Sequence, residues 1–441
     1  MRAAFDAVVA RHGALRSRFP AEDGNPAALV AQPGPVDVEF RDLRGGGDLL
    51  ETLIAERTNR AFDLARGPLL RVSLFRTGDT EHVLCLVLRH IVADGWSLNV
   101  LRDELAAHYT AHLKGEDADL PARPPTRPSN TTTRTRHRHA KPSTTGGNTW
   151  TAHPPWNFPP TARPRPPRQT FDGAGYGFQV DRALLDRLAA LGKAHGATIH
   201  VVLLAAFQEL LARFSGQREC AVGSPVAGRP EPELEGLAGM FVNVLALRAR
   251  FDGDPTFAAL LERTRETCPE AYAHQELPFA QHVTELNVER DVSRSPVFQA
   301  VLAVQNYATG RQAAAGPGLD VETYGLRASG TRFDVELFLM EWPDGLRGAF
   351  NYNTDLFDEA DIARLAAHLD RLLHAVADRP GVPLSTFDLL SADERALETG
   401  DFNHTEAPTP ADATLVSLID EQIARTPDAT AGRALSRPRH P

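Results

Sequence analysis

The sequence predicts an α+β protein in which helices pack on mixed β-sheets. Segments with strand patterning and segments with helical periodicity are interspersed without strict βαβ alternation, which disfavours a Rossmann or TIM-barrel fold. The sequence contains no GxGxxG loop and no Walker loop. The chain has 441 residues, 42% of them hydrophobic and 24% charged, as in a globular protein with room for two or three domains.

The first part of the chain combines two helices with three strands. Apolar residues recur at helical spacing in the helices and form short apolar runs in the strands. The expected elements are a helix over 3–15, strands over 32–40, 69–76 and 82–90, and a helix over 101–113. The strand HVLCLVLRH, 82–90, is almost continuously apolar, which is typical of a strand buried on both faces. Asp94-Gly95 supplies the turn after it, and Lys114-Gly115 ends the second helix.

Helices and strands follow one another irregularly in the rest of the chain. Helices are expected over 181–193, 197–214, 255–272 and 358–376. Strands are expected over 219–224, 241–248, 297–305, 333–341 and 346–352. The last helix carries Ile362, Leu365, Leu369 and Leu372 along one side, which is typical of a helix packed on a core.

One segment differs in composition from the rest. Residues 121–170 hold 12 of the 33 prolines and nine lysines or arginines, but no Asp, Glu, Leu, Ile, Val or Met. We therefore expect 121–163 to be disordered, including its basic run RTRHRHAK. The other residues carry 38 basic against 57 acidic side chains, and this net charge of −19 argues against a nucleic-acid partner.

The cysteines and the hydropathy pattern favour a cytoplasmic protein without a metal site. Cys85, Cys220 and Cys268 lie far apart, with no CxxC or Cys/His spacing that would make a zinc site. Free thiols are typical of a reducing compartment. No stretch approaches the roughly 18 apolar residues of a membrane helix, so no membrane association is expected.

A histidine follows the apolar strand, where a side chain can project from a rigid element. His90 can accept a proton near neutral pH, as a general base must, and Asp94 can orient the imidazole or brace the turn. By itself an HxxxDG pattern is a weak signal, because it recurs by chance and a histidine at a strand end is usually structural. No serine nucleophile elbow, paired-carboxylate motif or HExxH motif competes with it.

Five short motifs of one known family occur in this chain, in the family's order and at its spacing. The motifs are RHGALRSRF (11–19), LRHIVADGWSLNVL (88–101), VGSPVAGR (222–229), HQELPF (274–279) and RDVSRSPVFQ (290–299). The second is similar to a His-His-x-x-x-Asp-Gly signature, and the third to a Gly-x-x-Val-Ala-Gly-Arg motif. Together they resemble the condensation domains of nonribosomal peptide synthetases over about residues 1–120 and 165–395.

This resemblance implies two chloramphenicol-acetyltransferase-like lobes with mixed sheets, residues 1–120 and 164–395, and an active site in a tunnel between them. The implied reaction is peptide-bond formation, in which the amine of an acceptor thioester attacks the carbonyl of a donor thioester. Upstream and downstream peptidyl carrier proteins would deliver both substrates on phosphopantetheine. The domain itself is expected to bind no cofactor.

The resemblance also implies roles for residues around the signature. His90 matches the catalytic histidine, which would either deprotonate the amine or hold it by a hydrogen bond. Asp94 matches a structural position that pairs with the motif arginine, here Arg229. Gly95 would allow close approach of the phosphopantetheine thioester.

Other positions have two interpretations. Trp96, Ser97 and Asn243 are candidates for the lining of the substrate tunnel. A tryptophan more often packs than binds substrate, and an asparagine before a strand more often caps a turn. Arg11 and Arg16 are either motif residues with a role or plain surface charges.

The chain departs from the family pattern in three places. Arg89 stands where the signature has its first histidine, a position that mostly supports the architecture. The family's opening Ser-x-x-Gln-x-Arg motif is absent, from which we expect a truncated N-terminal lobe. The fourth motif, Tyr-x-Asp-Tyr-x-x-Trp, is missing from 121–160. Either a local reading-frame slip overwrote it, or this segment is a genuine disordered insertion.

The last residues resemble the start of another domain. FNHTEAPTPADATLVSLIDEQIARTPDATA, 402–431, is similar to the linker and first helix of an adenylation domain, so 396–441 is expected to be a linker and adenylation stub. Two functions stay open: condensation at His90, or a catalytically impaired fragment that only binds carrier proteins. An epimerization domain or an O-acyltransferase is a third reading, which the Asp-Gly-Trp-Ser continuation disfavours.

Overall fold

The computed structural model describes residues 1–46, 49–122, 163–286, 291–305, 318–322, 324, 330–400, 402 and 414–427. The chain forms two compact units, Met1–Asp388 and Leu389–Pro441. Within the first unit we call residues 1–122 the N-terminal lobe and residues 163–388 the C-terminal lobe. Apart from residues 121, 122 and 163, the segment expected to be disordered lies outside the described residues.

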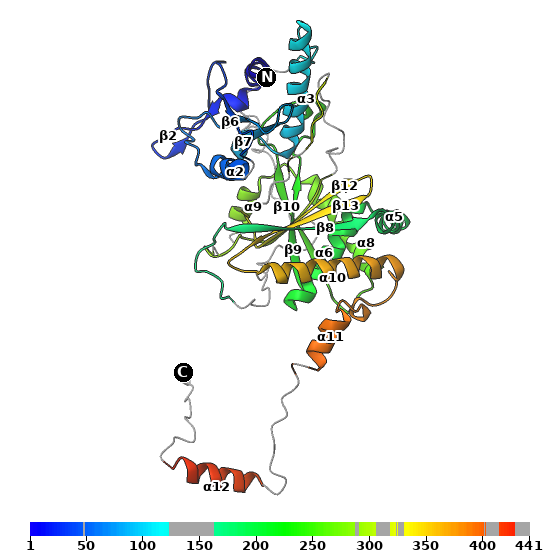
Figure 1. The fold of residues 1–441 in the computed structure, drawn as a ribbon. Helices are drawn as coiled ribbons and strands as arrows, with labels where there is room; N and C mark the ends of the chain where they lie inside the picture. Colours follow the sequence, from blue (N-terminus) through cyan, green and yellow to red (C-terminus); the bar gives the residue numbers. More distant parts are fainter. Residues whose placement is uncertain are drawn as a thin grey trace. The chain divides into compact units, whose positions relative to one another are not determined.

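The N-terminal lobe is a small sheet enclosed by helices (Figure 1). Its strands are β5 (Val38–Asp42), β6 (Leu70–Arg76) and β7 (His82–Leu88), in the order β5-β6-β7. Strand β5 runs parallel to β6, and β7 runs antiparallel to it. Side chains alternate along each strand, so Val72 and Phe75 of β6 face opposite layers. Phe75 packs on helix α2 (Leu49–Asn59), whereas Val72 packs on the side of α1 (Arg2–Arg11) and α3 (Gly95–Lys114).

The C-terminal lobe is built on a six-stranded sheet with the order β10-β9-β11-β12-β13-β8. The strands are β8 (Gly173–Asp181), β9 (Glu219–Val226), β10 (Asn243–Arg250), β11 (Ala300–Gln305), β12 (Val335–Trp342) and β13 (Gly345–Asn353). Strand β11 runs parallel to both of its neighbours, and all other pairs are antiparallel. The predicted α+β class with mixed sheets is therefore confirmed.

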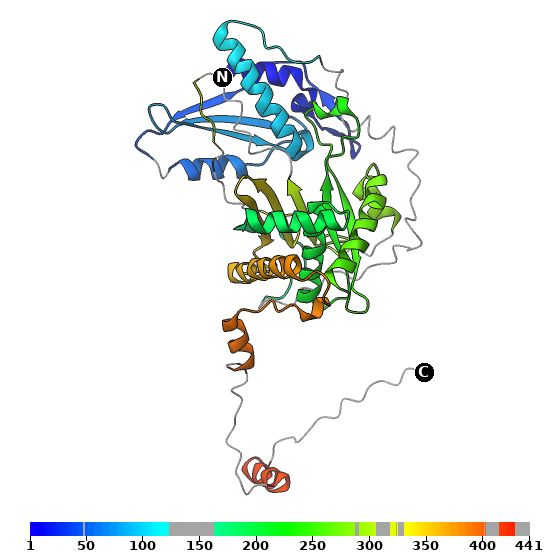
Figure 2. The same ribbon diagram turned by 90° about the vertical axis from the view of Figure 1, so that its right-hand side faces the viewer.

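Four long helices accompany this sheet (Figure 2). They are α5 (Arg182–Ala194), α6 (Ile199–Ser215), α8 (Phe257–Ala273) and α10 (Glu359–Asp378). Helix α6 is the centre of the core, because every residue from Val201 to Ala212 is buried. Its ends follow local chemistry: the Thr198 side chain accepts a hydrogen bond from the Val201 amide, and Gly216 takes the left-handed conformation that ends a helix.

The remaining described elements are short. They are η1 (Gly13–Arg16), β1 (Ser17–Arg18), β2 (Ala21–Glu22), β3 (Asn25–Pro26), β4 (Leu29–Val30), η2 (His90–Val92), α7 (Pro232–Glu235), α9 (Phe279–Glu285), η3 (Leu384–Thr386), α11 (Ala392–Thr399) and α12 (Leu415–Arg425). Of these, α11 and α12 belong to the second unit.

No single helix in the described parts of the chain is both long and apolar enough to cross a membrane. Among the described helices, one pair, α5 and α6, has the length and composition of a membrane span when the two are taken together, but the pair is bent by 101° at its junction.

The structure moves several predicted boundaries, each for a local reason. Helix α3 begins at Gly95 rather than at residue 101, because the Asp94 side chain caps it. Strand β5 begins at Val38 rather than at residue 32, since Pro33 and Pro35 lack the amide that a ladder requires. Strand β8 and helix α2 were not predicted from the sequence. In β8 the alternate glycines of GAGYG remove the apolar pattern by which a strand is recognised.

Candidate functional site

The candidate site begins where β7 ends. The Arg89 amide still donates to the carbonyl oxygen of Leu69 at 3.0 Å, which extends the pairing with β6 by one residue. His90 is the first residue of the single turn η2 (His90–Val92), so it lies directly after the end of a paired strand. The Arg89 side chain, which replaces the expected histidine, is exposed.

His90 is half-buried and has a ring nitrogen without a hydrogen-bond partner among the described residues. Its Nδ1 atom is buried and makes no hydrogen bond with any part of the chain that the structure describes. Buried polar atoms are nearly always satisfied in folded proteins, so such an atom in a motif position requires an explanation. A hydrogen bond that forms only with substrate is one such explanation.

Asp94 organises the turn after His90. It is the N-cap of α3, where Oδ1 accepts from the Ser97 amide at 2.9 Å and lies 2.7 Å from the Ser97 hydroxyl. The Ser97 hydroxyl in turn interacts with the Asp94 amide, completing a reciprocal capping box. Both side chains are buried, so the start of α3 is held rigidly next to His90.

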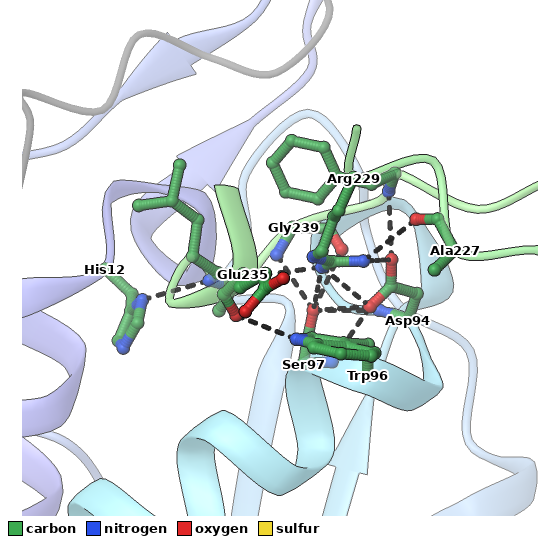
Figure 3. Close-up of polar contacts among 11 residues, drawn as sticks. His12, Asp94, Trp96, Ser97, Ala227, Arg229, Glu235 and Gly239 are labelled. Carbon is green, nitrogen blue, oxygen red and sulfur yellow. Dashed lines mark hydrogen bonds and ion pairs between the residues drawn. The ribbon is translucent and has the colours of Figure 1, made fainter. Parts of the chain in front are cut away.

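Arg229 of the C-terminal lobe binds the same carboxylate (Figure 3). Its Nη1 atom donates to Asp94 Oδ2 at 2.8 Å, and its Nη2 atom donates to Oδ1 at 3.0 Å. The two side chains are 1% and 2% exposed, so the ion pair is fully desolvated. The Phe241 ring lies beneath the guanidinium, with 4.3 Å between Cζ and the ring centroid. The pairing implied by the resemblance is therefore present in the structure.

The environment of Asp94 favours its charged form. Burial by itself raises the pKa of this carboxyl, but the hydrogen bonds and the charge of Arg229, together with the hydrogen bonds from Ser97, hold the pKa below its usual value. Asp94 therefore stays ionised at neutral pH and acts as a fixed acceptor for the turn.

Gly228 allows Arg229 to reach this position. Its φ angle is +63°, and a Cβ atom at this residue would lie 2.0 Å from the carbonyl oxygen of Phe241. A glycine is therefore required both by the backbone conformation and by the close approach of the neighbouring chain.

A stretch of the C-terminal lobe, residues 235–241, crosses onto the N-terminal lobe at this point; we call it the crossing segment. The Gly239 amide donates to the Ser97 hydroxyl at 3.0 Å, and the Asp94 amide donates to the Gly239 carbonyl oxygen at 3.2 Å. The Phe241 amide donates to Asp94 Oδ2 at 3.0 Å. Sequence reasoning missed these contacts, because they are made by backbone groups that any residue type supplies.

The structure brings Trp96 and Ser97 into this junction and leaves Asn243 outside it. The Trp96 indole N–H donates to the Glu235 carbonyl oxygen at 2.7 Å, so Trp96 joins the two lobes. The Asn243 amide group donates to the carbonyl oxygens of Gln275 and Leu277, at 2.9 and 2.6 Å, and accepts from an amide at 3.1 Å. Asn243 thus holds the turn between α8 and α9, the second of its two expected roles. Gly95 is exposed at the first turn of α3.

The early motif also makes specific contacts. Arg11 pairs with Glu104 of α3 at 3.2 Å and donates to the Pro121 carbonyl oxygen at 2.7 Å. Arg16 donates to the carbonyl oxygens of Val9 and Ala10, at the end of α1. Of the two interpretations of these arginines, a plain surface charge is therefore wrong, since both arginines hold α1 in place.

Among the described residues, no group of three or more His, Cys, Asp or Glu side chains could hold a metal ion. The three cysteines are free and buried.

The candidate site thus consists of a half-buried histidine that follows a strand, and of a turn that an ion pair between the two lobes holds in place. The profile of the condensation domain matches residues 1–397, so the chain belongs to the condensation-domain family. A linear gramicidin synthase polypeptide of Brevibacillus parabrevis is 39% identical over 428 residues, which cover 95% of this chain and 6% of that protein. Surfactin synthase subunit 1 of Bacillus subtilis (strain 168) is 34% identical over 429 residues, covering 97% of this chain and 12% of that protein.

The solved structures show the same fold. The X-domain from teicoplanin biosynthesis superposes with a TM-score of 0.74 at 27% identity, covering 88% of this chain and 89% of that one. The chain thus spans nearly all of a single solved domain but only a small part of the two synthases.

Proposed function

We propose that this chain catalyses peptide-bond formation between two carrier-bound thioesters, with His90 as its catalytic residue. The observation that carries the proposal is the buried Nδ1 atom of His90, which follows β7 and has no hydrogen-bond partner in the described parts of the chain, next to the Asp94–Arg229 clamp. Membership of the condensation-domain family supports the reaction type. The alternative remains a condensation-like fragment that binds carrier proteins without turnover.

The reaction needs no oxidant, reductant or bound cofactor. The acceptor amine attacks the carbonyl carbon of the donor thioester, a C–N bond forms and the C–S bond breaks. The proton lost by the amine nitrogen balances the proton gained by the departing thiolate, so the products are an amide and a free carrier thiol. His90 would either take the amine proton or hold the amine by a hydrogen bond while it attacks.

The other site residues would act by positioning. Asp94, Ser97 and Arg229 are committed to contacts with one another, so they would fix the turn that carries His90. Gly95 has no side chain and is exposed at the first turn of α3, where a phosphopantetheine arm could approach the backbone. Trp96 is assigned to the lobe junction in this proposal.

The proposed partners follow from the substrates. An upstream carrier protein would present the donor and a downstream carrier protein the acceptor, each on its phosphopantetheine arm.

We further propose that 396–441 is a linker and the start of an adenylation domain. Helix α12 supports this, because it exposes an apolar stripe, Leu415, Val416, Ile419 and Ile423, that a further part of a folded domain would cover. The three free thiols fit the reducing cytoplasm.

The test is a product assay with charged carrier proteins. A panel of donor and acceptor carriers is loaded from aminoacyl-coenzyme A and mixed with the purified chain, and dipeptidyl-carrier is quantified by mass spectrometry. His90→Ala is expected to lower the rate by about 10²–10⁴-fold, the usual contribution of a general base. His374→Ala is the matched control, because this histidine lies on α10 with a half-exposed side chain.

The outcomes separate the two functions. A rate that His90→Ala leaves unchanged would exclude catalysis by this site. Carrier binding by the unaltered chain without product across the whole panel would support the binding platform instead.

A further inference from the structure

His12 is a completely buried histidine that the proposed reaction does not use. It lies at the end of α1, and none of its surface is accessible to solvent. Its Nε2 atom is 2.8 Å from Oε2 of Glu104 on α3. Its Nδ1 atom is 3.2 Å from the backbone nitrogen of Ala238 in the crossing segment. A dashed line marks this interaction of His12 in Figure 3. One imidazole therefore bridges the two lobes.

The partners determine which nitrogen carries the proton. The Ala238 backbone N–H is a donor, so Nδ1 must offer a lone pair. Glu104 also accepts a hydrogen bond from Arg11 at 3.2 Å, as an ionised carboxylate does. Because an ionised carboxylate can only accept, the His12 Nε2 atom beside it must carry a hydrogen. The network therefore requires neutral His12 with its hydrogen on Nε2. Glu104 orients the ring, and the ring holds the Ala238 amide.

The residue that His12 holds is next to the residues that reach the site. Gly239 follows Ala238 directly and contacts Ser97 and Asp94 through its amide and its carbonyl oxygen. Two residues further on, the Phe241 amide donates to Asp94. A shift of the crossing segment by a single residue would therefore misalign every one of these contacts.

We propose that His12 is a positioning residue for the site: it holds the crossing segment in the register in which Gly239 and Phe241 meet Ser97 and Asp94. Its effect on turnover rests on the proposed function, whereas its effect on the segment does not. His12 acts at a distance from the reacting atoms, through Ala238, and is therefore distinct from the Asp94–Arg229 clamp.

Two conservative variants separate the contact of His12 with Ala238 from its contact with Glu104. In His12→Asn the amide oxygen can stand at the level of Nδ1 and accept from Ala238, while the contact with Glu104 is lost. In His12→Gln the amide nitrogen can reach the level of Nε2 and donate to Glu104, while the Ala238 N–H loses its acceptor. Of the two variants, only His12→Gln is therefore expected to loosen the crossing segment.

The experiment measures hydrogen exchange in the full chain, by mass spectrometry of peptides that cover 235–241, with peptides of α6 as reference. His12→Gln is expected to exchange about tenfold faster or more in 235–241 than the unaltered chain, as the loss of a buried hydrogen bond predicts, with α6 unchanged. His12→Asn is expected to stay close to the unaltered chain. In the carrier assay the turnover number should follow the same order, with a smaller change in KM.

Several results would overturn the proposal. Equal exchange in the two variants, or unaltered exchange in His12→Gln, would show that the Ala238 contact does not hold the segment. Loss of folding in both variants to the same extent would also overturn it, because His12 would then serve the whole fold. If the unaltered chain has no turnover, the proposed function fails, but the exchange measurement still decides the role of His12.

Discussion

The Asp94–Arg229 ion pair makes the strongest prediction about stability. Its side chains are 2% and 1% exposed and are joined by two hydrogen bonds of 2.8 and 3.0 Å. In Arg229→Ala the carboxylate stays buried with its Ser97 and Phe241 donors but without a compensating charge. Removal of one partner from such a pair costs about 3–5 kcal/mol, or about 10²–10⁴-fold in the folding equilibrium. Against a total of about 5–15 kcal/mol, this is a large part of the stability.

Equilibrium urea denaturation followed by circular dichroism measures this loss. The control is Arg182→Ala, because Arg182 and Glu341 also join distant parts of the sequence but are 48% and 55% exposed. The control should lose about 1 kcal/mol or less. The double variant Asp94→Asn/Arg229→Ala should lose less free energy of unfolding than the two single variants lose together, because it leaves no unpaired buried charge. A loss in Arg229→Ala no larger than in the control would refute the reasoning.

The same pair predicts a dependence on pH. Since the pKa of Asp94 is lowered in the folded protein, its contribution is present above its ordinary value of 3.8 and is lost as the pH falls through the lowered pKa. The stability difference between the unaltered chain and Asp94→Asn should therefore be constant near neutral pH and narrow below about pH 3.8. A difference that narrows between pH 8 and pH 6 would contradict this assignment.

Three further predictions follow from the site and the core. Gly228→Ala should lower the melting temperature clearly, because its Cβ atom would lie 2.0 Å from the Phe241 carbonyl oxygen; a melting curve identical to that of the unaltered chain would contradict the close approach. Ser97→Ala should lower the free energy of unfolding measured in urea by about 1–3 kcal/mol, since it removes the Ser97 half of the capping box and leaves the Gly239 amide without its acceptor. Thiol labelling at neutral pH should be slow in the folded chain and fast in urea, because burial raises the pKa of all three cysteines, Cys85, Cys220 and Cys268 (to about 11 for Cys268). Rapid labelling without denaturant would show that one thiol is accessible.

Local chemistry made much of the site predictable from the sequence. The apolar run before His90 identifies strand β7, although β7 is an edge strand in which only Cys85 is buried, so the expected burial on both faces is wrong. Asp94-Gly95 marks the end of the strand region, where Asp94 is the N-cap of α3 and Gly95 its first residue. Both signals lie within a few residues of the feature that they determine. The pairing of Asp94 with Arg229, 135 residues away, was expected only from the resemblance to a family, because no periodic pattern connects the two positions.

Other parts of the site could not be predicted in this way. The amides of Gly239 and Phe241 carry no residue-type signal, although they hold Ser97 and Asp94. Nothing in the sequence around Trp96 indicates that its indole N–H donates to the backbone carbonyl oxygen of Glu235, 139 residues away. Exposed arginines and structural arginines look alike in sequence, which is why the contact of Arg11 with Glu104 was not foreseen.

By itself, the sequence determined the α+β class, most of the helices and strands, and the position of His90 at a strand end, because these depend on periodicity and on local turn chemistry. Only the tertiary structure showed the long-range contacts of the site, of which the Asp94–Arg229 pair alone was expected from the resemblance. Asp94 meets Arg229, and His12 meets Glu104 and Ala238, at separations of 135, 92 and 226 residues. The contacts with Arg229 and Ala238 depend on how the two lobes come together, and the contact with Glu104 depends on how α1 packs on α3. Burial then makes each polar group require a specific partner.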